Sequence, residues 1–199
     1  MQTIGKTVTV AAMAVALLVA GAIAFGPTTD GPAGDLGTSV SNRSSSALLA
    51  PVVSAASLDG TIASLQDRLR AAPDDWRSSA SLGLAYVAQA RVTGDPSWYP
   101  KAEGVLARSL SVNADDNVDG VLGLGVRDLA RHDFSAALRH GRRAAALHPH
   151  GAKADGVIGD ALLELGSYDR AFRAFQTMVD TRPDLSSYAR VAYARELVG

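Results

Sequence analysis

Residues 152–183, which read AKADGVIGDALLELGSYDRAFRAFQTMVDTRP, decide the fold of this chain of 199 residues. Three landmarks in this stretch recur at a fixed distance of 34 residues earlier in the chain. The later and earlier copies pair Ile158-Gly159 with Leu124-Gly125, Ala171 with Ala137, and Pro183 with Pro149. A period of this length predicts a short supersecondary unit that buries its apolar face by stacking on copies of itself.

A third copy precedes these two and differs from them in length. It has Gly83 in the glycine column and Ala102 in the alanine column, with an aromatic residue three positions before Ala102, as in the later copies. Gly83 and Gly125 are 42 residues apart, however, so this copy carries an insertion. The insertion falls around residues 92–97, where Thr, Gly, Asp, Pro and Ser predict a turn.

The apolar residues of each copy follow the period of a helix, and strand alternation is absent from residues 58–199. In the copy at 152–183 they recur at steps of three and four residues, at Ala161, Leu162, Leu165, Ala171, Phe175 and Met178. Gly125 and Gly159 lie inside these helices, although glycine there costs about 1 kcal/mol relative to alanine. Close packing between helices explains both glycines better than flexibility does.

These columns resemble the tetratricopeptide repeat (TPR) family. Residues 152–183 carry the resemblance most fully, at Ile158-Gly159, Gly166, Tyr168, Ala171, Phe175 and Pro183. The chain departs from the family in its early Trp column, which holds Ser79, Val121 and Asp155, and in its Tyr column, where Asp128 and Leu162 follow Tyr86. The resemblance implies an all-α fold, a right-handed α-solenoid of about three helix-turn-helix units at 74–114, 118–149 and 152–183.

One further helix is expected on each side of the three units. Residues 58–71 are amphipathic, with Ile62, Leu65 and Leu69 on one side, which predicts a leading helix that caps the stack. Residues 184–198 predict a last helix without a pair. This last helix is interpreted either as a deliberate cap or as part of a repeat that continues in a longer protein.

The N-terminus has a membrane signal. After the single Lys6, residues 8–25 form an uncharged run rich in Ala, Val and Leu, and its length favours a signal anchor over a cleaved signal peptide. The alternative is cleavage after Ala24, because Ala22-Ile23-Ala24 has the small-x-small form of a cleavage site. Charge placement keeps the N-terminus cytoplasmic, so we expect a single-pass protein of the cell membrane with an extracytoplasmic C-terminal domain, or a secreted one after cleavage.

Residues 26–57 are rich in Gly, Pro, Ser and Thr, and this composition predicts a disordered linker between residues 1–25 and the repeat domain at 58–199. A coil of about 30 residues has a typical reach of roughly 30 Å, which suits a tether. The chain has no cysteine, which excludes lipidation on cysteine, disulfides and thiolate metal sites.

The charges of residues 58–199 balance, with 18 Asp and Glu against 17 Lys and Arg, so the composition indicates no nucleic-acid partner. A local exception lies in the second unit, where four arginines accompany all four histidines of the chain. The cluster comprises Arg131, Arg139, Arg142, Arg143, His132, His140, His148 and His150. The favoured interpretation is a solvated helical face whose basic end complements the helix dipole; the alternatives are a patch for an acidic partner and a weak metal site.

The sequence predicts no catalytic residue, no metal site and no cofactor. It contains neither a Gly-x-Ser-x-Gly motif nor a glycine-rich loop that ends in Lys-Ser or Lys-Thr. The acidic pairs Asp74-Asp75 and Asp115-Asp116 precede helical units, so both are interpreted as helix caps. We therefore expect a protein that is not an enzyme.

By resemblance to the family, a partner protein or peptide binds a concave groove lined by the first helix of every unit. The columns that line this groove hold Arg77, Leu84, Val87, Asp119, Leu122, Val126, Leu129, Lys153, Asp160, Leu163, Glu164, Arg190 and Ala194. They lack the Lys and Asn cluster that clamps a terminal carboxylate in some relatives, so an extended or helical segment of an envelope protein fits better. Trp98, in the insertion, is a candidate interface aromatic.

The function expected from the sequence is that of a membrane-tethered scaffold for protein-protein interaction. The alternatives are a substrate-binding or sensory module of a larger envelope assembly, and the N-terminal fragment of a longer repeat protein. A competing interpretation of the groove is that its apolar residues pack against neighbouring units.

Overall fold

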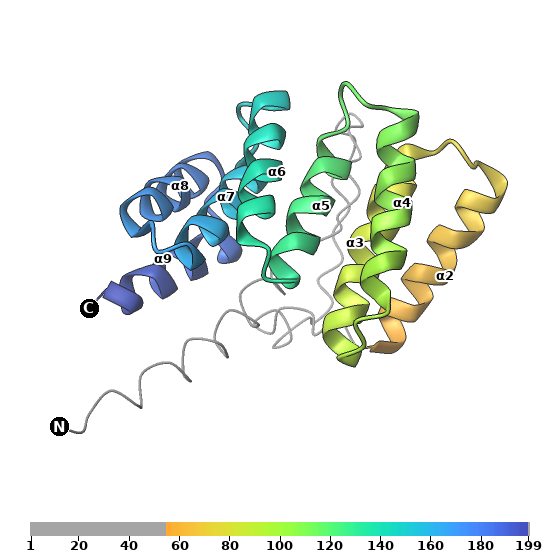
Figure 1. The fold of residues 1–199 in the computed structure, drawn as a ribbon, viewed down its shortest axis with the longest axis horizontal. Helices are drawn as coiled ribbons and strands as arrows, with labels where there is room; N and C mark the ends of the chain where they lie inside the picture. Colours follow the sequence, from red (N-terminus) through yellow and green to blue (C-terminus); the bar gives the residue numbers. More distant parts are fainter. Residues whose placement is uncertain (1–54, 199) are drawn as a thin grey trace, which may run out of the picture. The chain divides into compact units, whose positions relative to one another are not determined.

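The computed structural model describes residues 55–198, and this part of the chain consists of helices joined by short turns, without strands (Figure 1). The helices are α2 (Ala55–Ala71), α3 (Trp76–Thr93), α4 (Trp98–Val112), α5 (Val118–Ala130), α6 (Phe134–Leu147), α7 (Ala152–Glu164), α8 (Tyr168–Thr181) and α9 (Leu185–Val198). The predicted all-α fold is confirmed. The predicted membrane segment at 8–25 and the linker at 26–57 lie outside the described residues, apart from the last three linker positions, which are helical.

The helices pack as a stack of hairpins. Within each unit the two helices pair, as α3 with α4, α5 with α6 and α7 with α8. The first helices of successive units, α3, α5 and α7, also pack side by side, and α9 packs on α7 and α8 (Figure 1). Helix α2 packs on α3, and within residues 55–198 no later helix forms a hairpin with α9. The expectation of three units between a leading helix and an unpaired last helix is therefore confirmed.

Polar side chains begin the first helix of each of the first two units. Oδ1 of Asp75 accepts a hydrogen bond from the Ser78 N–H at 3.1 Å, so this acidic residue caps α3 as predicted. The prediction for Asp115-Asp116 was wrong, because Asn117 caps α5 and accepts from the Gly120 N–H at 2.8 Å. Asn117 is fully buried, where the charge of a carboxylate would be costly. Its amide Nδ2 also donates a hydrogen bond to Oγ of Ser109, which a carboxylate could not do.

The turn inside each hairpin contains a residue in the left-handed region. These residues are Gly94 with φ of 68°, His132 with φ of 60° and Gly166 with φ of 73°. The prediction that all of 92–97 forms a turn was partly wrong, because α3 continues through Thr93 and the turn begins at Gly94. The insertion therefore lengthens the helix, which has 18 residues where α5 and α7 have 13 each.

In the first and third units, the glycine column brings the two helices of the unit together. A Cβ atom on Gly159 would lie within 2.9 Å of three carbon atoms of the Phe175 ring, which is buried against α7. A Cβ atom on Gly83 would likewise lie 2.5 Å from Cγ of Leu106 on α4. Close helix packing, the interpretation preferred from the sequence for Gly125 and Gly159, holds for both, but a Cβ atom on Gly125 would lie 2.9 Å from Cγ1 of Val157, on the first helix of the next unit.

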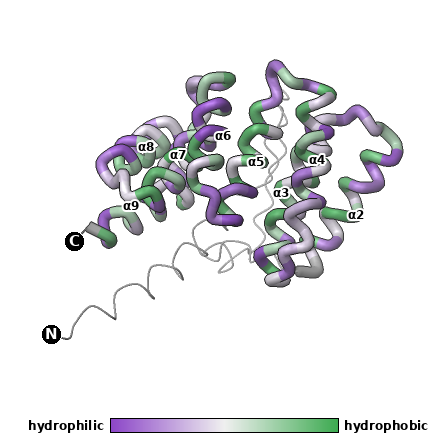
Figure 2. The backbone as a smooth tube through the Cα atoms, in the orientation of Figure 1, coloured by the Kyte–Doolittle hydropathy of each residue, from purple (hydrophilic) through white to green (hydrophobic). Residues whose placement is uncertain are grey.

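The core follows the stack, and a buried polar network lies within it. Apolar side chains meet between neighbouring helices, and hydrophilic residues mark turns such as those from α2 to α3 and from α5 to α6 (Figure 2). Inside the stack, Nδ2 of Asn117 donates to Oγ of Ser109 at 2.8 Å, and this hydroxyl donates to the Trp76 carbonyl at 2.6 Å. The network joins the start of α3, the end of α4 and the start of α5.

Candidate functional site

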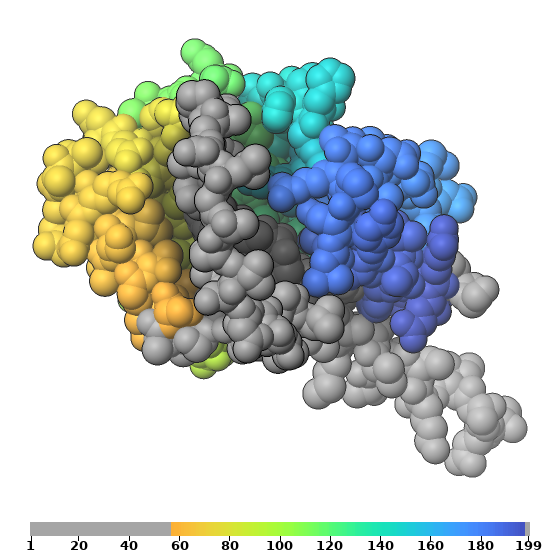
Figure 3. Space-filling view, turned by 180° about the vertical axis from the view of Figure 1, so that it is seen from behind, coloured from red at the N-terminus to blue at the C-terminus, as the bar shows by residue number. Residues whose placement is uncertain are grey.

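The candidate binding face is formed by the first helices of the units, of which α3 and α7 lie on the side seen from behind in Figure 3. The predicted groove residues lie at equivalent positions on these helices and on α9, and the structure divides them into a buried, a half-exposed and an exposed group.

The buried group belongs to the core of the repeats. Its members are no more than 7% exposed and comprise Val87, Leu122, Leu129, Leu163, Arg190 and Ala194. Val87 packs in the cluster of α2, α3 and α4, while Leu122 and Leu129 pack with residues of α6 and α7. The apolar members of this group therefore stabilise the stack in this structure, in line with the competing interpretation of packing between units.

The half-exposed group forms the centre of the candidate face. Leu84 on α3 and Val126 on α5 are half-buried, and Val126 packs against the cluster that contains Val87. Both residues stand in the same column of the repeat, on helices that pack side by side. They provide a small apolar surface that solvent reaches.

Asp160, in the same column of α7, forms an ion pair with Arg190 of α9. Nε of Arg190 donates to both carboxylate oxygens at 2.9 and 3.1 Å, and Nη2 donates to Oδ2 at 3.0 Å. Burial raises the pKa of the Asp160 carboxyl, and the charge and hydrogen bonds of Arg190 act in the opposite direction. Since only 4% of the Arg190 side chain is exposed, this pair ties α9 to α7.

The fully exposed group is charged and lies at the ends of the helices. Arg77, Asp119 and Lys153 stand in the first turns of α3, α5 and α7, so their charges alternate along the stack. Nζ of Lys153 lies 3.9 Å from Oδ1 of Asp119, a weak surface contact. Glu164 stands at the opposite end of α7. The Arg77 guanidinium lies 4.1 Å from the centroid of the Trp76 ring, and all four charged side chains are exposed to a partner.

Trp98, the predicted interface aromatic, is half-buried at the start of α4. Its ring centroid lies 5.4 Å from that of Tyr86, and Nζ of Lys101 lies 3.9 Å above the ring. It packs against the cluster of α2, α3 and α4, so only part of its ring is accessible. Its role at an interface stays a prediction.

A charged network inside the stack was not foreseen from the sequence. Asp128 of α5, whose side chain is 3% exposed, contacts Nδ1 of His140 at 2.7 Å and accepts from Nε of Arg127 at 3.0 Å. Nη1 of Arg127 lies 3.1 Å from Oε2 of Glu103, so the network joins α4, α5 and α6. Burial acts to raise the pKa of Asp128, but the hydrogen bonds from His140 and Arg127 and the charge of Arg127 outweigh it and lower that pKa.

This network also corrects the interpretation of the histidine cluster. His140 does not lie on a shared exposed face, because its ring is turned inward to Asp128. His132, His148 and His150 are exposed. Across residues 55–198 no three His, Asp or Glu side chains come close enough together to hold a metal ion. The signal for the network was Asp128 in the family's Tyr column, twelve residues before His140.

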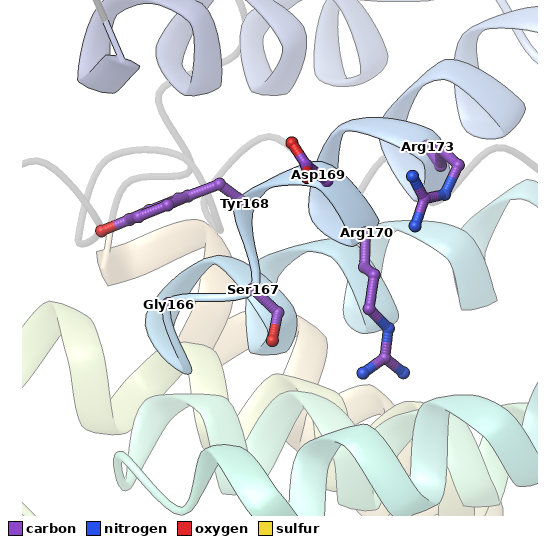
Figure 4. Close-up of a pocket in the computed structure, with 6 residues that line it drawn as sticks. All are labelled: Gly166, Ser167, Tyr168, Asp169, Arg170 and Arg173. Carbon is purple, nitrogen blue, oxygen red and sulfur yellow. The ribbon is translucent and has the colours of Figure 1, made fainter.

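A hollow of about 410 Å³ lies at the turn between α7 and α8 (Figure 4). It is lined by Gly166, Ser167, Tyr168, Asp169, Arg170 and Arg173. All of these except Ser167 are exposed, and the side chains of Tyr168 and Arg170 point in different directions. The hollow is an open turn without converging polar groups.

In the described part of the chain no helix is both long and apolar enough to cross a membrane.

Comparisons with known proteins agree with this geometry. Residues 122–186 match the tetratricopeptide repeat family, a segment that runs from α5 into α9. A crystal structure of MamA superposes with a TM-score of 0.53 at 22% identity, covering 72% of this chain and 80% of that one. A structure of MamA AMB-1 gives a TM-score of 0.52 at 25% identity, covering 73% and 82%. No curated protein matches the sequence significantly. The chain therefore has the tetratricopeptide-like fold that the sequence predicts.

Proposed function

We propose that this protein is an extracytoplasmic scaffold tethered to the cell membrane, and that it binds a segment of another envelope protein along the face of α3, α5 and α7. The fold itself is that of a scaffold for protein-protein interaction. The observation that carries the finer proposal is the pairing of an accessible apolar centre, Leu84 and Val126, with charges on its rim.

The distribution of accessible groups suits a segment and not a globular surface. An apolar centre bordered by polar side chains is the usual anatomy of a protein interface. Here the centre is narrow, because the apolar residues of the neighbouring columns, such as Val87, Leu129 and Leu163, are enclosed in the core. A single helix or extended strand of the partner, with one apolar stripe and flanking charges, would cover it.

The exposed charges that border the apolar centre would set the direction in which the partner segment binds. Positive, negative and positive charges follow one another at Arg77, Asp119 and Lys153. A segment that crosses the three helices with the opposite order of charges would be preferred over its reverse, because like charges placed opposite each other disfavour binding.

The membrane tether is proposed from residues 8–25 and from the Gly, Pro and Ser content of residues 26–57. Protease added to intact cells tests the topology. We expect digestion of the repeat domain without lysis and retention of the protein in the membrane pellet after alkaline extraction. Protection from protease in intact cells would contradict the proposal.

Site-specific photo-crosslinking in living cells tests the binding face. A photoreactive residue is placed at Arg77 or at Lys153, both exposed on the face, and at Gln176, exposed on the outer helix α8, as the matched control. We expect one polypeptide to be captured at both rim positions and not at Gln176. Equal capture at all three positions, or capture at Gln176 alone, would contradict the proposed face.

A further inference from the structure

Helix α6 carries charge of a single sign on its exposed surface. Between Phe134 and Leu147 it contains Arg139, Arg142 and Arg143 and no acidic residue. All three arginines are exposed, while the opposite side of the helix is buried through its small residues. We call these three side chains the α6 arginine patch.

The patch lies on one side of the helix. Its members are three and four residues apart, and residues at these spacings are neighbours on a helix surface. With a rise of 1.5 Å per residue, the patch spans about 6 Å along the axis. Three guanidinium groups thus face the same direction from a rigid element that is packed into the stack.

The fold does not use these charges. Several arginines of the described chain form ion pairs, as Arg108 does with Asp74 at 2.6 Å and Arg182 does with Asp184 at 3.0 Å, while others, such as Arg170 and Arg173 on α8, form none. No ion pair or hydrogen bond from the side chains of the α6 arginine patch occurs within residues 55–198. Like charges at these spacings destabilise a helix. No stabilising contact of the patch within the described residues offsets this repulsion.

The helix dipole does not explain the patch either. Cations favour the last turn of a helix, and the effect decays within that turn. The last turn of α6 contains no basic residue, and its end is satisfied by the His148 N–H, which donates to the carbonyl of Ala144 at 2.9 Å. These arginines lie on a solvated helical face, as the interpretation favoured from the sequence has it, but they stand before the last turn of α6, so the helix dipole does not account for them.

We infer that the outer face of α6 binds an acidic protein segment, at a second site separate from the face of α3, α5 and α7. Arginine presents a planar fork that pairs with a carboxylate through two hydrogen bonds, and its charge persists at all physiological pH values. Carboxylates three and four residues apart on a partner helix match the spacing of the patch. The whole chain carries a net charge of −1, and nucleic acids and anionic membranes call for a broader basic surface.

A binding titration tests the inference on the full chain in a neutral detergent at low salt. The probe is a fluorescein-labelled helical peptide with glutamates at positions i, i+3 and i+4, and anisotropy reports binding. We expect saturable binding that the triple substitution Arg139→Gln, Arg142→Gln, Arg143→Gln weakens at least tenfold. The matched control, Arg170→Gln with Arg173→Gln on the outer helix α8, should change affinity less than twofold.

Two further measurements separate loss of binding from loss of folding, and charge from hydrogen bonding. The thermal midpoint of the triple variant should equal or exceed that of the parent, because repulsion is relieved. Replacement of the three arginines by lysine should give intermediate affinity, because charge stays while the paired hydrogen bonds are lost. Absence of peptide binding, equal binding by the triple variant, or tighter patch-dependent binding to anionic vesicles or single-stranded DNA would overturn the inference.

Discussion

Replacement of Gly159 by alanine tests whether the glycine column sets the distance between the helices of a unit. In an exposed helix this change stabilises by about 1 kcal/mol, because glycine is the weaker helix former. At Gly159, however, the added Cβ would lie within 2.9 Å of three ring carbons of Phe175. The ring is 1% exposed and cannot swing into solvent, so α7 and α8 must move apart.

The two effects oppose each other, and overpacking wins. An added methyl group in a close-packed core costs about 1–3 kcal/mol, and contact with three atoms of a rigid ring places this site at the upper end. After subtraction of the helix gain, we expect Gly159→Ala to destabilise by about 2 kcal/mol. For a domain of this size that lowers the thermal midpoint by roughly 8 °C.

Gly104 provides the matched control, because it lies inside α4 and a Cβ there meets no atom within 4 Å. Gly104→Ala should therefore stabilise by about 1 kcal/mol. Urea unfolding followed by circular dichroism measures both variants. In a Phe175→Leu background the cost of Gly159→Ala should largely disappear. The reasoning is refuted if Gly159→Ala stabilises as much as Gly104→Ala does.

Two polar sites give further predictions. Asn117→Ala should destabilise by about 2–4 kcal/mol in urea unfolding, since it removes a cap and leaves the buried hydroxyl of Ser109 without its donor; Asn113→Ala, in a partly exposed turn, should cost less than about 1 kcal/mol. Asp128→Asn should cost about 1–3 kcal/mol at pH 7. Because folding lowers the pKa of Asp128, its carboxylate stabilises the fold above pH about 4. The difference in unfolding free energy between the parent and Asp128→Asn should therefore vanish as pH falls through the lowered pKa. A difference that is independent of pH would contradict the role of the His140 pair.

Most of the fold could be predicted from the sequence, because residues that allow close helix packing recur at a fixed spacing. Gly159 predicts a close helix contact, which the Phe175 ring provides, and the same kind of contact recurs in the first unit between Gly83 and Leu106. The turn at His132 has no glycine, yet its backbone adopts the same left-handed conformation as the turns at Gly94 and Gly166.

The candidate site was harder to predict from the sequence, because the resemblance assigns several columns to the groove without separating those that solvent reaches from those that neighbouring helices cover. Leu84 and Val126 are half-exposed, whereas Leu122 and Leu129, assigned to the groove by the same resemblance, are enclosed. Which of them a neighbour covers depends on the angle between adjacent helices. That angle follows from the summed packing of many side chains and leaves no local signal in the chain.

The sequence by itself determined the architecture of this protein, since the period and the apolar pattern of the helices are local features that recur from copy to copy. Only the tertiary structure decided which charged side chains form ion pairs. It placed Asp160 against Arg190 and Asp128 against His140, pairs 30 and 12 residues apart, and it left the arginines of α6 without partners. The physical reason is that an ion pair depends on side chains meeting across helices, and such meetings exist only once the units have stacked.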